Sequence, residues 1–283
     1  MPHNECLRAY AKINLGLRIT EKRPDGYHNL QTVFVQVPIY DKLFISESPD
    51  DQCHLAIEGI AIDGAIEQNL VIRAWQLAKD YAPERVHPVS ICLHKLIPMG
   101  AGLGGGSSDA ATVLRWCNTH FDLQCSDIQM EQMIRRIGAD CPFFIQGGTT
   151  YATGIGDVFS PIAINLSGYT LVLVKPNVHV STVQAYAGVS PHQPKLSVRD
   201  AIIQPIATWR DTLGNDFEPS VFASYPELAT IKALLYKAGA VYASMSGSGS
   251  SLFGIFEQTP DEAMLRTNLP TDAYYWQGSF HLP

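Results

Sequence analysis

The sequence predicts a two-domain protein of mixed α and β structure, of the α/β or α+β class. Its 283 residues suit one large domain or two medium-sized ones, and 46% apolar against 17% charged residues suffice for buried cores. Strand and helix patterns are interspersed over residues 1–155, and the predicted elements of the second half follow one another with a different spacing. We expect an N-terminal domain over residues 1–155 and a C-terminal domain over residues 156–283, with the boundary near residues 154–160.

Hydrophobic spacing predicts the elements of the N-terminal domain. Val89, Ile91 and Leu93 alternate with polar residues, as in a half-buried strand. Ser126 and Gln129 form a capping-box pattern at the start of a helix. The predicted strands are residues 32–37, 43–46 and 89–94, and the predicted helices are residues 69–81 (with Leu70, Ala74, Ala78 and Tyr81 on one face), a helix starting near Ser107 or Ser108, and residues 126–138.

The C-terminal domain shows fewer but clear signals. Gly239 closes a helix that begins at Pro226, and Thr259 followed by Pro260 is a strong helix start with Thr259 as the N-cap. Residues 187–210 contain Pro and Gln with weak periodicity, and no structure is predicted there. Strands are predicted at residues 169–174, 241–245, 252–256 and 273–280.

Composition narrows the functional class. A formal charge of −7 and a pI of 5.7, without a dense Lys/Arg stripe, exclude a broad nucleic-acid-binding surface. No apolar run approaches the roughly 20 residues that span a bilayer, and the N-terminus lacks an apolar signal core. We therefore expect a cytoplasmic protein with a small-molecule substrate and reduced thiols at its six cysteines, none of which has Cys-x-x-Cys or zinc-site spacing.

The segment from Pro98 to Asp109 is the most informative stretch. Five of the seven residues 100–106 are glycine, and a predicted helix follows directly. Such a loop can bring backbone N–H groups close to phosphate oxygens, and Ser107 and Ser108 can add hydroxyls to phosphate or to Mg²⁺. The G-x-G-x-x-G match alone is weak evidence for a dinucleotide fold, since Pro98 interrupts the end of the strand and no strand ending in Asp or Glu follows about 20 residues later. A P-loop would need a lysine before Ser107, and the His-Arg-Asp and Asp-Phe-Gly signatures of protein kinases are missing. A flexible turn is the remaining alternative.

Five motifs together resemble the superfamily of galactokinase, homoserine kinase, mevalonate kinase and phosphomevalonate kinase. The match is carried in family order by residues 9–15, 23–32, 98–111, 138–144 and 247–251. The Gly-Leu-Gly-Gly-Gly-Ser-Ser-Asp-Ala-Ala form and residues 23–32 are similar to the branch that phosphorylates a cytidine-diphosphate-linked sugar alcohol in isoprenoid-precursor synthesis.

This resemblance implies fold and activity. The N-terminal lobe is expected to be like ribosomal protein S5 domain 2, and the C-terminal lobe ferredoxin-like. The activity implied is ATP-dependent phosphorylation of an alcohol with Mg²⁺ on the ATP phosphates. Two alternatives stay open, a superfamily kinase acting on homoserine or a mevalonate-type alcohol, and a non-catalytic ligand sensor on the same fold.

The resemblance assigns catalysis to Asp140 and Lys12. A carboxylate near the acceptor hydroxyl can accept its proton, and a lysine can stabilise the developing negative charge. The alternative for Asp140 is an N-cap ahead of Pro142, and the alternative for Lys12 is a surface lysine. The strand pattern around Lys12 places Asn14 on the same side.

The remaining site residues follow from the same resemblance. Tyr27 and Tyr186 are expected to hold the cytosine ring, His28 to bond its edge, and Thr182 to reach the diphosphate or polyol. Alternatives are a packed helix aromatic for Tyr186, a solvated turn residue for His28 and a solvent lysine for Lys95. The predicted ATP-binding residues are Asn69, Leu70, Lys95, Pro98, Gly100, Ala101, Gly102, Leu103, Gly104, Gly105, Gly106, Ser107 and Ser108, and the predicted substrate-binding residues are Asn14, Tyr27, His28, Thr182, Tyr186, Gly247 and Ser248. Metal ligands and oligomeric state are not predicted.

Overall fold

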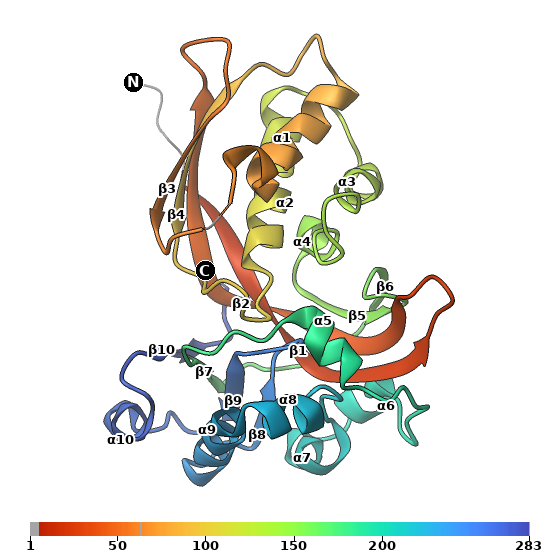
Figure 1. The fold of residues 1–283 in the computed structure, drawn as a ribbon, viewed down its shortest axis with the longest axis vertical. Helices are drawn as coiled ribbons and strands as arrows, with labels where there is room; N and C mark the ends of the chain where they lie inside the picture. Colours follow the sequence, from red (N-terminus) through yellow and green to blue (C-terminus); the bar gives the residue numbers. More distant parts are fainter. Residues whose placement is uncertain (1–5, 63, 283) are drawn as a thin grey trace. The chain divides into compact units, whose positions relative to one another are not determined.

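The computed structural model describes residues 6–62 and 64–282, which form two compact units (Figure 1). The first contains the chain up to Ala11 together with Ile39–Met99 and Gly104–Gly147. The second contains Lys12–Pro38, Gly100–Leu103 and the chain from Gly148 onward. Both units mix helices with sheet, which agrees with the predicted fold class. The N-terminal half of the chain enters the second unit twice, which a single boundary at residues 154–160 does not describe.

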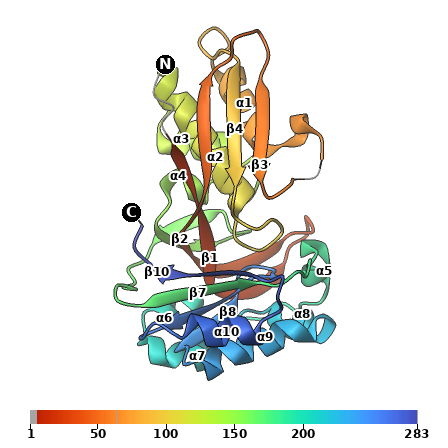
Figure 2. The ribbon, with the colours of Figure 1, turned by 90° about the vertical axis from the view of Figure 1, so that its left-hand side faces the viewer.

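In the first unit, helices cover one face of a sheet formed by β3, β4 and the second half of β2 (Figure 2). β4 pairs in parallel with β3 and antiparallel with β2. α1 and α2 pack side by side on the sheet. The strands are β2 (His28–Glu47), β3 (His54–Gly59) and β4 (Val89–Lys95), and the helices are η1 (Ile66–Gln68), α1 (Leu70–Tyr81), α2 (Gly105–His120), α3 (Asp127–Ile134) and α4 (Phe143–Gln146).

The strand predictions for this unit are confirmed with one correction. Residues 89–94 form β4, and its burial alternates as expected. Residues 32–37 and 43–46 are not separate strands, because both belong to the continuous strand β2. Pro38 lies between the stretch of β2 that pairs with β5 and the stretch that pairs with β4, so its missing N–H removes no bond from either ladder.

The helix predictions are confirmed in type and shifted at their ends. Asn69 caps α1, since its Oδ1 accepts a hydrogen bond of 3.0 Å from the Val71 N–H, while Tyr81 is 48% exposed and off the buried face. The capping box of Ser126 and Gln129 is present at α3. α3 ends at Ile134, before the predicted end at Gly138, and a hydrogen-bonded turn follows it.

The second unit contains a four-stranded antiparallel sheet in the order β10-β7-β9-β8, with α9 packed against β8 and β9. The first half of β2 pairs with β5, β5 pairs with β6, and β1 pairs with β2. The strands are β1 (Leu7–Lys22), β5 (Thr149–Thr153), β6 (Val158–Pro161), β7 (Thr170–Lys175), β8 (Tyr242–Met245), β9 (Leu252–Phe256) and β10 (Tyr274–Ser279), and the helices are α5 (Thr182–Ala187), α6 (Val198–Ile202), η2 (Ile206–Thr208), α7 (Trp209–Thr212), α8 (Glu218–Ser224), α9 (Pro226–Lys237) and α10 (Glu262–Asn268).

Two details of the C-terminal half differ from expectation. The N-cap of α10 is Asp261, not Thr259, because its carboxylate accepts bonds from the Ala263 and Met264 N–H groups. The stretch at residues 187–210 contains helix α6 and leads into α7. Trp209 anchors it, being 1% exposed, with its Nε1 donating to the Gln204 carbonyl at 3.0 Å. Such short helices leave little periodicity to detect in a sequence.

The cysteines are free thiols in varied environments. Cys117, Cys125 and Cys141 are buried, and Cys6 is exposed. Burial raises the pKa of Cys117 to about 12 and that of Cys141 to about 11, so both stay protonated at neutral pH. Within residues 6–62 and 64–282, no helix is both long and apolar enough to cross a bilayer.

Candidate active site

The glycine-rich segment leads into an uncapped helix N-terminus. Gly100, Gly102 and Gly104 have φ values of +58°, +72° and +69°, in the left-handed region that glycine adopts without strain. α2 begins at Gly105, earlier than the predicted start at Ser107 or Ser108, and its N-cap Gly104 has no side chain to cap it. The first N–H groups of this 16-residue helix and its positive dipole end are therefore suited to an anion such as phosphate.

Ser107 connects this helix start to the segment that bears Asp140. A β-carbon at Gly138 would lie 2.8 Å from Cys141 Sγ and 3.7 Å from Ser107 Oγ, so these residues are in close contact. Pro142 is the N-cap residue of α4 and makes no side-chain cap hydrogen bond, and Asp140 lies two residues before it. Asp140 is half-buried in the turn before α4. The first unit thus brings the phosphate-loop helix and the predicted catalytic aspartate into one neighbourhood.

Lys12 lies on β1 in the second unit and is 3% exposed, so it is not a surface lysine. Its Nζ donates to Asn14 Oδ1 at 2.8 Å, which confirms that both side chains share a face. It also lies 5.0 Å from the centroid of the Phe34 ring, a favourable cation–π position. Asn14 is held in turn by Thr32, whose Oγ1 accepts from Asn14 Nδ2 at 3.0 Å. The ammonium is therefore presented in a fixed, buried position.

Three of the predicted motifs meet inside the second unit. The Lys12 N–H donates to the Leu103 carbonyl at 2.9 Å, joining β1 to the glycine-rich segment. The Ser246 hydroxyl donates to the Gly102 carbonyl at 2.9 Å and accepts from the Asn14 N–H at 3.3 Å. Gly102 has no room for a side chain, since a β-carbon there would lie 2.0 Å from the Ser246 carbonyl oxygen. Ser246, which the sequence did not single out, therefore joins all three motifs.

The residues predicted for the nucleobase form a different arrangement from the expected one. His28, not Tyr27, stacks on Tyr186, with ring centroids 4.9 Å apart and planes 28° apart. Phe217 packs edge-on to Tyr186 at 4.8 Å. Tyr27 is 60% exposed. Burial, and then the charge of Lys22, lower the pKa of His28, which favours its neutral ring.

Thr182 and Ser248 lie together at the start of α5. Their hydroxyl oxygens are 3.3 Å apart, so two of the predicted substrate-binding residues are adjacent in the second unit. Gly247 follows Ser246 in the same loop and faces Asn14, because a β-carbon on it would lie 3.4 Å from Asn14 Oδ1. This loop therefore links the Lys12 network to the polar residues of α5.

The three residues predicted to border the adenine lie in different environments. Leu70 lies beside the glycine-rich segment, 3.6 Å from the position of a β-carbon on Gly106. Asn69 uses its side-chain oxygen to cap α1. Lys95 is not a solvent lysine, since it is fully buried and its ammonium is bonded to Asp41 and Asp109. The predicted direct contact between the Lys95 side chain and nucleotide thus has no support from its position.

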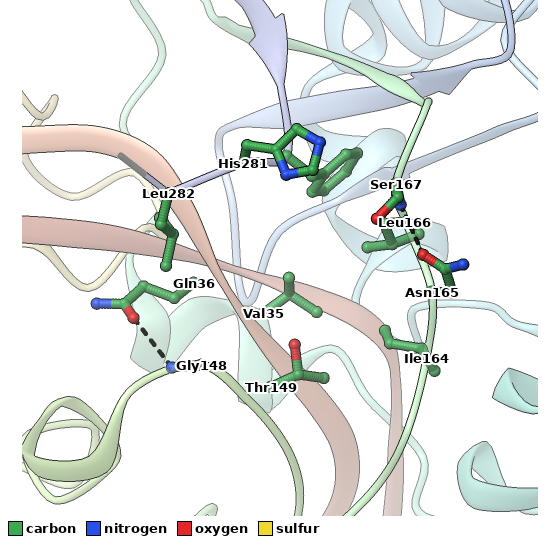
Figure 3. Close-up of a pocket in the computed structure, with 11 residues that line it drawn as sticks. Val35, Gln36, Gly148, Thr149, Ile164, Asn165, Leu166, Ser167, His281 and Leu282 are labelled. Atoms are coloured by element: carbon green, nitrogen blue, oxygen red, sulfur yellow. Dashed lines mark hydrogen bonds between the residues drawn. The ribbon is translucent and has the colours of Figure 1, made fainter.

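A pocket of about 190 Å³ lies in the second unit, and none of the predicted site residues lines it (Figure 3). Two hydrogen bonds join residues of its lining: the Gly148 N–H donates to Gln36 Oε1 and the Ser167 N–H to Asn165 Oδ1, each at 2.9 Å. None of its lining residues is Lys, Arg, Asp or Glu. This lining offers no charged side chain for a phosphate group, whereas the glycine-rich segment offers free backbone N–H groups.

Comparison with protein families supports the motif assignment. Residues 69–148 match the GHMP kinases N terminal domain, and residues 200–269 match the GHMP kinases C terminal domain. A protein of Bacteroides thetaiotaomicron named 4-diphosphocytidyl-2-C-methyl-D-erythritol kinase is 49% identical, with 95% of this chain and 97% of that protein covered. A protein of the same name from Porphyromonas gingivalis is 43% identical, with 94% and 96% covered.

Solved structures give the same result for the fold. A crystal structure of 4-(cytidine 5'-diphospho)-2C-methyl-D-erythritol kinase has a TM-score of 0.79 and 30% identity, covering 96% of this chain and 98% of that one. Mevalonate kinase of Methanococcus jannaschii has a TM-score of 0.73 at 13% identity, covering 99% of both chains, which indicates a shared fold alone.

Proposed function

Because the chain belongs to the GHMP kinase family, we propose that it transfers the γ-phosphoryl group of ATP to the 2-hydroxyl of 4-diphosphocytidyl-2-C-methyl-D-erythritol. The products are ADP and the 2-phosphate, in the non-mevalonate route to isoprenoids. The identity of 43–49% to kinases of that name, over nearly the whole length, carries the proposal. Its place of action would be the cytoplasm, where ATP is available.

The glycine-rich segment is proposed to bind the ATP phosphates. Phosphoryl transfer depends mainly on positioning and charge stabilisation, and the uncapped N–H groups of α2 supply both. Within residues 6–62 and 64–282, no group of three or more His, Cys, Asp or Glu residues could hold a metal ion. Mg²⁺ is therefore proposed to bind through phosphate oxygens and water, where it would neutralise phosphate charge.

Asp140 and Lys12 are the proposed catalytic residues. Asp140 would accept the proton of the acceptor hydroxyl as its oxygen attacks the γ-phosphorus. Lys12 would stabilise the negative charge that develops on this oxygen, an interaction strengthened by its burial. Because Asn14 fixes the Lys12 ammonium beforehand, little reorganisation is needed during the reaction.

An ADP-release assay tests the proposed activity. The purified protein with Mg-ATP is offered 4-diphosphocytidyl-2-C-methyl-D-erythritol, homoserine and mevalonate in parallel. We expect turnover with the cytidylyl substrate alone. Turnover of homoserine or mevalonate without the cytidylyl substrate would point to another kinase of the superfamily, and binding without any turnover would point to a ligand sensor.

Tyr186 is proposed to stack on the cytosine, which would then replace the His28 ring. Tyr186→Ala should raise KM for the cytidylyl substrate by at least about threefold, because base–aromatic stacking contributes about 1–3 kcal/mol and the lost contact with His28 offsets part of it. KM for ATP should stay within about twofold. Tyr186→Phe keeps the ring and is the matched control. Equal KM values for the two variants would show that the ring does not hold the base.

A further inference from the structure

Three ionisable side chains are buried together in the first unit, next to the start of α2. Asp41 on β2, Lys95 at the end of β4 and Asp109 in α2 are 0%, 0% and 1% exposed. Lys95 Nζ donates to Asp41 Oδ2 and, at 2.8 Å, to Asp109 Oδ2. We call this set the Asp41–Lys95–Asp109 cluster.

Stability does not explain this cluster. Burying ions is costly, and replacing buried ion pairs with apolar side chains is often neutral or stabilising. Here one lysine faces two carboxyl groups, and Asp109 Oδ1 has no hydrogen-bond partner among the described residues. Burial raises the pKa of Asp109 to about 8. A cluster that is expensive in this way suggests a role in positioning.

The bonds of the cluster connect the two ends of the glycine-rich segment. Asp41 Oδ1 accepts from the Leu96 and Ile97 N–H groups, at 2.5 and 2.8 Å, and so holds the chain that enters the segment. Asp109 lies one turn into α2, the helix that leaves it. Lys95 joins the two carboxylates.

The start of α2 also rests directly on Lys95. A β-carbon at Gly105, the first residue of the helix, would lie 2.9 Å from Lys95 Nζ and 3.0 Å from Ile97 Cγ2. The ammonium therefore determines how closely the helix N-terminus can approach the entering strand. A shift of this N-terminus would move the N–H groups that face the phosphates.

We propose that Asp41, Lys95 and Asp109 are positioning residues for ATP, which hold the N-terminus of α2 at a fixed distance from the chain entering the glycine-rich segment. The inference rests on the proposed ATP site. It assigns Lys95 an indirect role in nucleotide binding, through the helix start and without contact between its side chain and the nucleotide.

Two substitutions break the cluster at different points. Asp109→Ala removes the bond between Lys95 and α2 and leaves the bond between Lys95 and Asp41 in place. Asp41→Asn keeps a carbonyl oxygen for the Leu96 and Ile97 N–H groups but loses the second acceptor oxygen that faces Lys95. Each should raise the Kd for Mg-ATP about tenfold, because a displaced helix start no longer presents its N–H groups to the phosphates in the binding geometry.

The controls separate positioning from stability. Asp109→Asn keeps an acceptor for Lys95, so its Kd for Mg-ATP should stay near that of the wild type. Val113→Ala truncates a buried residue of the same helix, so it should lower Tm without changing this Kd. The Kd is measured by titration calorimetry on folded protein, and KM for ATP and for the cytidylyl substrate are measured beside it, with only the former expected to rise.

The outcomes are distinct. A lower Tm with an unchanged Kd for Mg-ATP in Asp109→Ala and Asp41→Asn would overturn the proposal. If Asp41→Asn does not fold, the comparison of Asp109→Ala with Asp109→Asn decides. Wild-type protein that binds no Mg-ATP would refute the proposed function itself, whereas equal binding by wild type and both variants refutes only the role of the cluster.

Discussion

Asp140→Asn should lower kcat by about 10²–10⁴-fold while KM for ATP changes by less than about threefold. The substitution keeps the size and shape of the side chain but removes its capacity to accept the proton of the acceptor hydroxyl. The local fold should persist because asparagine keeps a side-chain oxygen acceptor, and the Cys141 N–H bonds to the Gly138 carbonyl independently of the side chain. Steady-state kinetics with the cytidylyl substrate, together with Tm, provide the measurement.

The control for this experiment is Asp127→Asn, which removes an exposed carboxylate from the first turn of α3 in the same unit. Its kcat should stay within about twofold of wild type, since surface substitutions usually have small effects. If Asp140→Asn retains a kcat within threefold of the wild-type value, Asp140 is not the base, and the reaction needs another proton acceptor.

Gly102→Ala should reduce kcat/KM for ATP by about 100-fold or more, because displacing a positioning element by about 1 Å can have an effect of that size. A β-carbon at this residue would lie 2.0 Å from the Ser246 carbonyl oxygen and 2.9 Å from its carbon, both parts of the main chain. The backbone must therefore move, and the bond from the Ser246 hydroxyl to the Gly102 carbonyl is strained with it. The measurement is initial rate against ATP concentration.

Gly168→Ala separates this steric effect from backbone strain. Its φ of +85° is close to the +72° of Gly102, but a β-carbon at Gly168 meets nothing within 4 Å. Both variants pay the roughly 1–2 kcal/mol of a left-handed non-glycine residue, so both should lose Tm. Only Gly102→Ala should lose activity, and equal activity in the two variants would contradict the steric argument.

The sequence predicted those parts of the site that depend on local patterns. Five glycines before a helical repeat predict a phosphate loop, and the alternation around Lys12 correctly places Asn14 beside it. The start of α2 was predicted too late because Ser107 and Ser108 are typical N-cap residues. Gly104 takes this position instead, since its left-handed φ of +69° turns the chain into the helix.

Residues that act through contacts distant in sequence were harder to find. Ser246 is linked to Asn14 and Gly102 by the tertiary fold, which no local pattern encodes. Asp41 did leave a signal, because it shares the buried alternation of Leu43 and Ile45. Lys95 likewise continues the buried face of Val89, Ile91 and Leu93. When an acidic residue on one strand and a basic residue on a neighbouring strand both occupy positions of the buried apolar face, they predict a buried ion pair.

The His28 ring covers one face of the Tyr186 ring and shields it from water. An incoming cytosine would have to exchange places with the imidazole, so the free energy gained is the difference between two ring contacts and not the full value of one. The His28 ring would therefore lower the affinity for any planar molecule that binds by stacking alone. Only a ligand with additional bonds, to its phosphates or its polyol, would offset the free energy of displacing His28.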